Sequence, residues 1–298
     1  MIDWTIIKIL SWTESYFKDH SIDSPRLTAE ILLGFCLDVK RLDLYLQHDR
    51  PLEKNELTLF KSLIKRRIGR EPVAYIIGEK GFYESSFQVR EGVLIPRPDT
   101  ETLVEKAIDL LGTGKGYNPA FRGARKVLEL GVGSGAIIVS LARACPDHDY
   151  FACDLSWISL GTAIENAEKI LKTPVRFFQG SWFDSIKKQE YFDLIVSNPP
   201  YIPAHEIQDL ASEIKLHEPR LALDGGADGL DSIREILARA RNYLLPGGRI
   251  LLEIGFDQKE SVESITKTYP EYENIEFIKD LAGHNRLFSA QKYIEKTN

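Results

Sequence analysis

The sequence predicts an α/β protein, with a mostly parallel, doubly wound sheet of seven strands and a small N-terminal helical domain. From Lys126 onward, short apolar runs that suit strands alternate with segments of helical periodicity. Such alternation is typical of a parallel sheet covered by helices. Before about residue 72, apolar residues recur at helical spacing, which predicts a separate helical part.

The N-terminal helices are expected where the apolar periodicity is clearest. Pro25 after Ser24 favours a helix start, and Pro51 followed by Glu53 and Glu56 favours the next one. The expected helical segments are Trp4–Leu10, Leu27–Leu37 and Leu57–Ile68.

The most basic stretch of the chain comprises Lys65, Arg66, Arg67 and Arg70. It fits a solvated helix C-terminus, where cations are favoured. It also fits a docking surface for a partner or its RNA.

Residues 73–95 are predicted to form a small linker hairpin. Glycines punctuate short β-like runs there, at Val73–Ile77, Phe82–Tyr83, Phe87–Val89 and Val93–Ile95. We therefore expect a helical domain at 1–72, the linker at 73–95 and an α/β domain at 96–298.

The α/β domain is expected to open with IPRPDTE, in which Asp99 or Thr100 caps an amphipathic helix. A flexible connection follows at 112–119. The expected strands are Val127–Leu130, Tyr150–Cys153, Val175–Gln179, Phe192–Ser197 and two near 275–279 and 286–291. The segment LLPGGRILLEIG (244–255) is expected to supply a turn and a further strand. The expected helices are Ala136–Ala144 and about 157–171, 231–244 and 258–268.

A glycine-rich turn follows the first of these strands, in the segment ELGVGSGAI (129–137). Gly131, Gly133 and Gly135 allow a tight turn and a close approach of a ligand to the backbone. Val132 and Ser134 complete the loop. The alternatives are a purely structural turn and a nicotinamide site, whose fingerprint tolerates Ala136. Glu129 disfavours a pyrophosphate and favours the α-ammonium group of a methionine moiety.

Two further residues at strand ends are candidate cofactor ligands. Asp154 ends the second strand, where a carboxylate can accept hydrogen bonds from both hydroxyls of a ribose; it could also cap the next helix. Trp182 lies in GSWFD (180–184), where an adenine edge is expected. Its ring could stack on that base or belong to the core.

The sharpest signal is NPPY, residues Asn198, Pro199, Pro200 and Tyr201, after the apolar strand FDLIVS. The prolines stiffen the backbone and remove two donors. The Pro199 carbonyl and the Asn198 side-chain carbonyl then offer two acceptors to a planar –NH2 group. Tyr201 offers a face on which that group can stack. A rigid structural turn is the alternative.

This arrangement suits methyl transfer to an amide or amine nitrogen. An amide nitrogen is a poor nucleophile because its lone pair is delocalised, so the gain must come from positioning and electrostatics. No strong base is required, since the methylated nitrogen readily loses a proton.

The amino-acid composition makes some classes of substrate, cofactor and cellular location less favourable than others. Lysine and arginine number 38 against 44 acidic residues, a net charge of −6, which disfavours a nucleic-acid substrate. Cys36, Cys145 and Cys153 form no CxxC pair, so neither metal nor disulfides are expected. The N-terminal MIDWTIIKILSW lacks the features of a signal peptide, and no run is long enough to span a membrane. We expect a cytoplasmic protein.

Taken together, ELGVGSGAI, Cys153-Asp154, SWFD and VSNPPY resemble the Rossmann-like class I methyltransferases. Further segments resemble the glutamine methyltransferases of peptide release factors: PVAYIIGEKGFYESSFQV (72–89), LIPRPDTETLVE (94–105) and HEPRLALDGGADGLD (217–231). The resemblance covers about residues 65–290, and the N-terminal helices at 1–72 fit the helical substrate-recognition domain of that family. It implies that residues 96–298 form the cofactor-binding methyltransferase domain. IPRPDTE favours this branch over its sibling that modifies a ribosomal protein.

The resemblance implies S-adenosyl-L-methionine as cofactor, with S-adenosyl-L-homocysteine as product. It assigns the cofactor to Gly131–Gly135, Asp154, Trp182 and Asn198, with Glu129 beside them. It assigns Asn198–Tyr201 to the glutamine of a Gly-Gly-Gln loop in class I release factors, bound by a monomeric enzyme. The segment at 94–105 would lie over the cofactor. Glu129 departs from a frequent Asp and Val132 from a common Thr.

Two other functions stay open. An adenine N6-methyltransferase acting on DNA or RNA also binds a planar –NH2 group, although it must flip a base and usually carries a basic recognition region. A non-catalytic module could keep the fold and an inert pocket.

Overall fold

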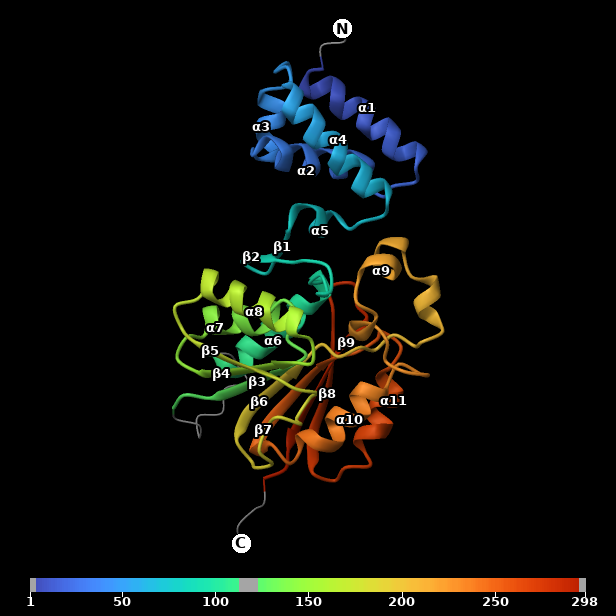
Figure 1. Ribbon diagram of the computed structural model, residues 1–298. Helices are drawn as coiled ribbons and strands as arrows, with labels where there is room; N and C mark the ends of the chain where they lie inside the picture. The colour runs from blue at the N-terminus through green and yellow to red at the C-terminus, as the bar shows by residue number, and fades with distance from the viewer. Residues whose placement is uncertain (1–3, 113–122, 295–298) are drawn as a thin grey trace. The chain divides into compact units, whose positions relative to one another are not determined.

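The computed structural model describes residues 4–112 and 123–294, which form two compact units (Figure 1). The first contains the chain up to Gly78 together with Ala211–His217, and the second contains the remainder. The expected connection at 112–119 falls, after Gly112, outside the described residues. The functional division at residues 72 and 95 remains our proposal. No helix within the described ranges is long and apolar enough to cross a membrane.

The first unit is helical, as predicted. Its apolar faces share one core, whose largest fully buried side chains include Phe17, Leu32 and Phe60. Glu53 precedes the fourth helix and forms a capping box with Glu56, which explains that helix start. The helices are α1 (Ile6–Asp19), α2 (Pro25–Leu37), α3 (Arg41–Leu46), α4 (Lys54–Ile68), α5 (Val73–Ile77) and α9 (Ser212–His217).

The basic run at the end of α4 forms internal contacts in this unit. Arg67 is 5% exposed and binds Glu213 at 2.7 Å. Arg66 pairs with Glu71, and Arg70 donates to the carbonyls of two residues that follow α1, His20 and Ser21, at 2.9 and 2.8 Å. The arginines therefore tie the last turn of α4 to its neighbours, which neither sequence interpretation anticipated.

The predicted strand at Val73–Ile77 is wrong, because this segment is helix α5. Its β-branched and aromatic residues favour strands locally, but Tyr75 and Ile76 are buried and the helix ends at Gly78 with φ +82°. Val93–Ile95 is also not a strand. The hairpin itself is confirmed, as β1 (Glu79–Phe82) paired antiparallel with β2 (Ser85–Gln88).

Among the described residues, seven strands form the large sheet of the second unit, in the order β5-β4-β3-β6-β7-β9-β8. Strands β3 to β7 are parallel, and β9 runs antiparallel to β7 and β8. The predicted strands are confirmed as β3 (Lys126–Leu130), β4 (Asp149–Asp154), β5 (Val175–Gln179), β6 (Phe192–Ser197), β7 (Leu244–Glu253), β8 (Tyr272–Lys279) and β9 (Asn285–Lys292).

Helices cover both faces of this sheet (Figure 1). In β3, Val127 packs with one helical layer, whereas Leu128 and Leu130 pack with the other, as the two-residue period of a strand requires. The first layer holds α6 (Glu101–Leu111), α7 (Ala136–Ala144) and α8 (Trp157–Ile170). The second holds α10 (Asp231–Ala240) and α11 (Lys259–Thr266).

The helix after IPRPDTE begins as predicted, but its expected side-chain cap is wrong. Thr100 occupies the N-cap position of α6 without capping it. Its hydroxyl donates to Glu253 at 2.6 Å, and Asp99 pairs with Arg286 at 3.2 Å. Tertiary partners have replaced the local hydrogen bonds.

Gly135 provides a test of this packing. Its φ is +82°, and an added methyl group would lie 3.1 Å from the Cβ of Ala163 in α8. We expect Gly135→Ala to lower the free energy of unfolding by about 1–3 kcal/mol, measured by urea denaturation. Gly161→Ala is the matched control, since an added methyl at Gly161 meets nothing within 4 Å and alanine favours a helix interior by up to about 1 kcal/mol. Equal stabilities for the two variants would contradict the packing argument.

Candidate active site

A pocket of about 280 Å³ lies in the second unit, where the loops following the parallel strands meet. The carboxyl ends of β3 and β6 are neighbours in the sheet, although β4 and β5 lie between these two strands in the sequence. Ligands of open α/β sheets bind at such a switch point. The lining residues are Gly92, Leu94, Gly131, Gly133, Asp154, Leu155, Ser156, Ser159, Gly180, Ser181, Trp182, Asn198, Pro200, Pro219, Leu221, Ala222, Asp224 and Ser232.

Six of the predicted site residues therefore meet in one pocket: Gly131, Gly133, Asp154, Trp182, Asn198 and Pro200. The other six predicted residues do not line the pocket. Val132, Ser134, Gly135 and Pro199 are buried, Glu129 is 1% exposed, and Tyr201 is partly buried.

The glycine-rich loop is held by the strand next to it. The N–H groups of Gly131 and Val132 both donate to the carbonyl of Cys153 at 2.9 Å. Gly131, Gly133 and Gly135 all have positive φ, which suits glycine and explains the spacing of the motif. At Gly133 an added methyl would meet nothing within 4 Å, so the bare backbone faces open space.

Asp154 connects the glycine-rich loop with the start of α8. Its Oδ2 accepts from the N–H of Gly133 at 2.9 Å, and its Oδ1 accepts from Ser156 at 2.8 Å. Burial raises the pKa of Asp154, while these N–H groups act in the opposite direction. The helix cap itself is Ser156, which accepts from Ser159. Each carboxylate oxygen keeps further acceptor capacity toward the pocket.

Glu129 acts on the same loop from the side of α7. Its Oε2 accepts from the N–H of Ile138 in the first turn of that helix at 2.8 Å, where a carboxylate also complements the helix dipole. Burial raises the pKa of Glu129 well above its usual range, and Asp154 raises it further. Contact of Glu129 with the α-ammonium group of a ligand remains a prediction.

Trp182 lines the pocket and also packs against the core cluster between the sheet and the layer of α10 and α11. The two interpretations of its ring are therefore compatible. An added Cβ at Gly131 would lie 3.6 Å from the Trp182 ring. The backbone of Trp182 has φ +47°, which is uncommon for a bulky residue and is the kind of strain that gathers at binding sites.

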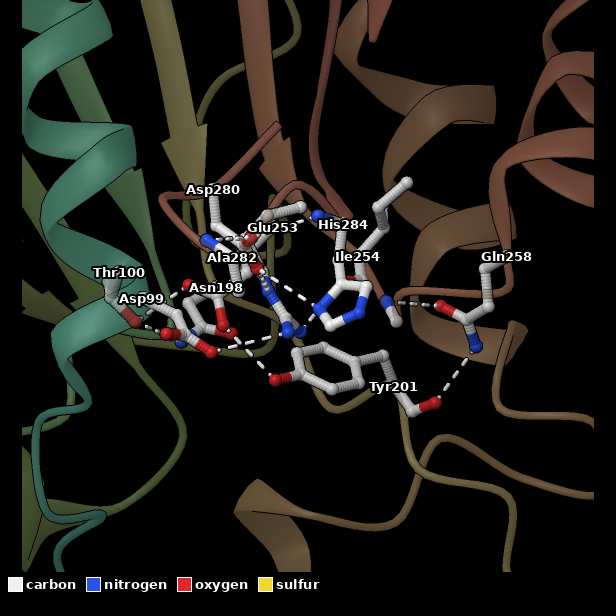
Figure 2. A network of polar contacts seen from close by, with 12 residues as sticks. Asp99, Thr100, Asn198, Tyr201, Glu253, Ile254, Gln258, Asp280, Ala282 and His284 are labelled. Atoms are coloured by element: carbon white, nitrogen blue, oxygen red, sulfur yellow. Dashed lines mark hydrogen bonds and ion pairs between the residues drawn. The ribbon is translucent and has the colours of Figure 1, made fainter. Parts of the chain in front are cut away.

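The NPPY segment is positioned by the strand before it and by residues behind it. Ser197 donates to the carbonyl of Leu130 at 2.7 Å, joining the ends of β6 and β3. Asn198 donates through Nδ2 to Thr100 at 3.2 Å, which turns its Oδ1 away from Thr100. The side-chain hydroxyl of Tyr201 donates to Glu253 at 3.1 Å. The backbone carbonyl of Tyr201 accepts from the side chain of Gln258 at 2.9 Å (Figure 2).

Sequence reasoning assigned no role to several residues that organise the site. Asn166 in α8 is fully buried and joins the hairpin at Gln88 to the carbonyl of Ser134. Glu218 accepts from Ile95 and Arg97, which links the loop after NPPY to the IPRPDTE segment. The signal for both was weak, because single polar residues in a helix or a loop carry no spacing pattern.

Comparison with known proteins agrees with this geometry. A crystal structure of a methyltransferase from Pyrococcus furiosus has the same fold, with a TM-score of 0.52 and 20% identity over 72% of this chain and 92% of that one. Residues 118–227 match the methyltransferase small domain, and residues 8–78 match the PrmC N-terminal domain. The fold is thus that of a Rossmann-like class I methyltransferase, as predicted.

The curated relatives are more specific. A release factor glutamine methyltransferase of Rhodopirellula baltica is 38% identical over 294 residues, which cover 97% of both chains. Another, from Geobacter sulfurreducens, is 42% identical over 259 residues, or 87% of each chain. The chain belongs to the release factor glutamine methyltransferase family.

The buried Glu129 predicts a pH effect on stability. Its raised pKa means that the folded state binds the proton more tightly than the unfolded state. This contribution to stability is complete below the usual value of 4.5 and is lost as the pH rises through the raised pKa. Glu129→Gln should therefore gain melting temperature relative to the wild type as the pH rises above about 4.5. The exposed Glu260→Gln serves as control, and a pH-independent difference for Glu129→Gln would refute the assignment.

Proposed function

We propose that this protein transfers a methyl group from S-adenosyl-L-methionine to the side-chain amide nitrogen, N5, of a glutamine in the Gly-Gly-Gln loop of class I peptide release factors. The observation that carries the proposal is the shared pocket, in which Asn198 and Pro200 lie with Gly131, Gly133 and Asp154. Family membership supports the protein substrate, since the relatives are named release factor glutamine methyltransferases.

The pocket suits the proposed cofactor. Its volume of about 280 Å³ lies just below the range of about 300–1,000 Å³ that is usual for small-molecule sites. Gly131 and Gly133 let a ligand approach the backbone, Asp154 can accept from ribose hydroxyls, and Trp182 offers an aromatic face. Glu129, Val132, Ser134 and Gly135 would support this site from behind. When bound, S-adenosyl-L-methionine supplies an electrophilic methyl group on a sulfonium centre.

Residues 198–201 suit a carboxamide substrate. The Oδ1 of Asn198 and the carbonyl of Pro199 are proposed to accept the two N–H bonds of the glutamine side chain, with Tyr201 packing beside it. These contacts would fix the direction of the nitrogen. Because the lone pair of an amide is delocalised, orientation and electrostatic stabilisation would account for most of the acceleration. The proton would leave from the nitrogen after methylation.

The remaining partners follow from the same proposal. The N-terminal helical unit would recognise the release factor, and no nucleic acid would be a direct substrate. The enzyme would act as a monomer in the cytoplasm. An acidic net charge of −6 supports a protein partner over a nucleic acid.

The decisive experiment combines labelled S-adenosyl-L-methionine, the purified chain and an unmodified class I release factor, followed by peptide mass mapping. We expect one methyl group on the Gly-Gly-Gln glutamine. Label in duplex DNA or RNA, and none in the release factor, would instead support an adenine N6-methyltransferase.

Two substitutions should separate substrate from cofactor binding. Asn198→Ala should lower kcat by about 10²–10³-fold, as for loss of one preorganised polar contact to the reacting group. It should leave cofactor affinity, measured by calorimetry, nearly unchanged. Asp154→Ala should mainly weaken cofactor binding. Asn242→Ala, at the end of α10, is the matched control, and near wild-type turnover for Asn198→Ala would disprove the proposed amide clamp.

A further inference from the structure

Glu253, the last residue of β7, is hydrogen-bonded to Thr100 and to Tyr201 of the NPPY segment. It is 1% exposed. Its Oε2 accepts from the Thr100 hydroxyl at 2.6 Å, and its Oε1 accepts from the Tyr201 hydroxyl at 3.1 Å. Figure 2 shows Thr100, Asn198 and Tyr201 gathered about this carboxylate. Glu253 does not line the pocket, so any effect on the reaction must pass through these residues.

Two hydroxyl groups and one guanidinium group surround the buried carboxyl group of Glu253. Burial raises the pKa of Glu253, and the Thr100 hydroxyl, the charge of Arg286 and the Tyr201 hydroxyl act in the opposite direction. Arg286 is itself held by ion pairs with Asp99 at 3.2 Å and Asp280 at 3.4 Å. In the structure both carboxyl oxygens of Glu253 act as acceptors, one from Thr100 and one from Tyr201.

The direction of the hydrogen bonds then follows from proton counting. A threonine hydroxyl has one hydrogen, and Thr100 gives it to Glu253. Towards Asn198, the Thr100 oxygen can therefore only accept. The group of Asn198 that faces Thr100 must be the –NH2 of its amide, as the 3.2 Å contact from Nδ2 has it.

We propose that Glu253, acting through Thr100, is a positioning residue that fixes the orientation of the Asn198 side-chain amide and so keeps Oδ1 directed at the substrate. This inference rests on the proposed function, in which Oδ1 accepts from the glutamine –NH2. The opposite orientation would present the –NH2 of Asn198 to another –NH2 group, and neither could accept.

Replacement of the Glu253 carboxylate by an amide should disturb the hydrogen bonds that Glu253 forms with Thr100 and Tyr201. Glutamine at position 253 has one acceptor oxygen and one donor nitrogen. If the nitrogen faces Thr100, that hydroxyl is released to donate to Asn198, and the amide of Asn198 turns over. If the nitrogen faces Tyr201, that hydroxyl loses its acceptor. Either arrangement breaks one of the two contacts.

The test measures kcat and KM with an unmodified release factor, together with cofactor affinity by calorimetry and melting temperature, on the full chain. Thr100→Val, which keeps the shape and removes the hydroxyl, should lower kcat by about 10- to 100-fold. Cofactor affinity should change by less than about threefold. Glu253→Gln should lower kcat similarly, and Thr100→Ser, which keeps the hydroxyl, should stay within about threefold of the wild type.

Thr266→Val is the matched control, because it removes another buried threonine hydroxyl, which donates to Val262 within α11. A loss of kcat in Thr100→Val that Thr266→Val does not share, at equal melting temperatures, would support positioning. Wild-type kcat in Thr100→Val, or a loss that Thr100→Ser fails to restore, would overturn the inference alone. A wild-type chain that methylates no release factor would overturn the proposed function, and the inference with it.

Discussion

The parallel pairing of β3 with β6 at the centre of the sheet is the constraint on which the site depends. Its register places Leu130 beside Ser197, so the two strands end together. The chain leaves β3 toward β4 and β5 on one side and returns to β6 on the other. The glycine-rich loop and NPPY, which are far apart in the sequence, therefore begin next to each other. The pocket results from this change of direction.

Acidic residues near the ends of the parallel strands hold neighbouring loops and helix starts in place. Glu129 binds the first turn of α7, Asp154 binds the glycine-rich loop and the start of α8, and Glu253 binds Thr100 and Tyr201. Burial raises the pKa of all three carboxyl groups. A buried polar group is costly unless it is hydrogen-bonded, so each carboxyl group is stable only where its donor partners are correctly placed. The same groups thus stabilise the loops and set their geometry.

Local patterns were reliable where one physical cause dominated. The strands from β3 to β9 followed from apolar runs, and the glycine spacing followed from positive φ at Gly131, Gly133 and Gly135. They failed where tertiary contacts outweighed local preference. Val73–Ile77 has strand-forming residues but is a helix, since burial of Tyr75 and Ile76 in the helical core decides its conformation. Thr100 looked like a helix cap, and its hydroxyl binds Glu253 instead.

By itself, the sequence determined the fold class, the order of the strands of the large sheet along the chain and the candidate residues at the strand ends, because these depend on periodicity and on short motifs. Only the tertiary structure decided which of those residues line the pocket and which support it from behind. Glu253 is 153 residues from Thr100 in the chain, and no spacing rule connects them. Their contact exists because β7 follows β6 in the sheet and α6 begins beside both, an arrangement that packing of the whole sheet imposes.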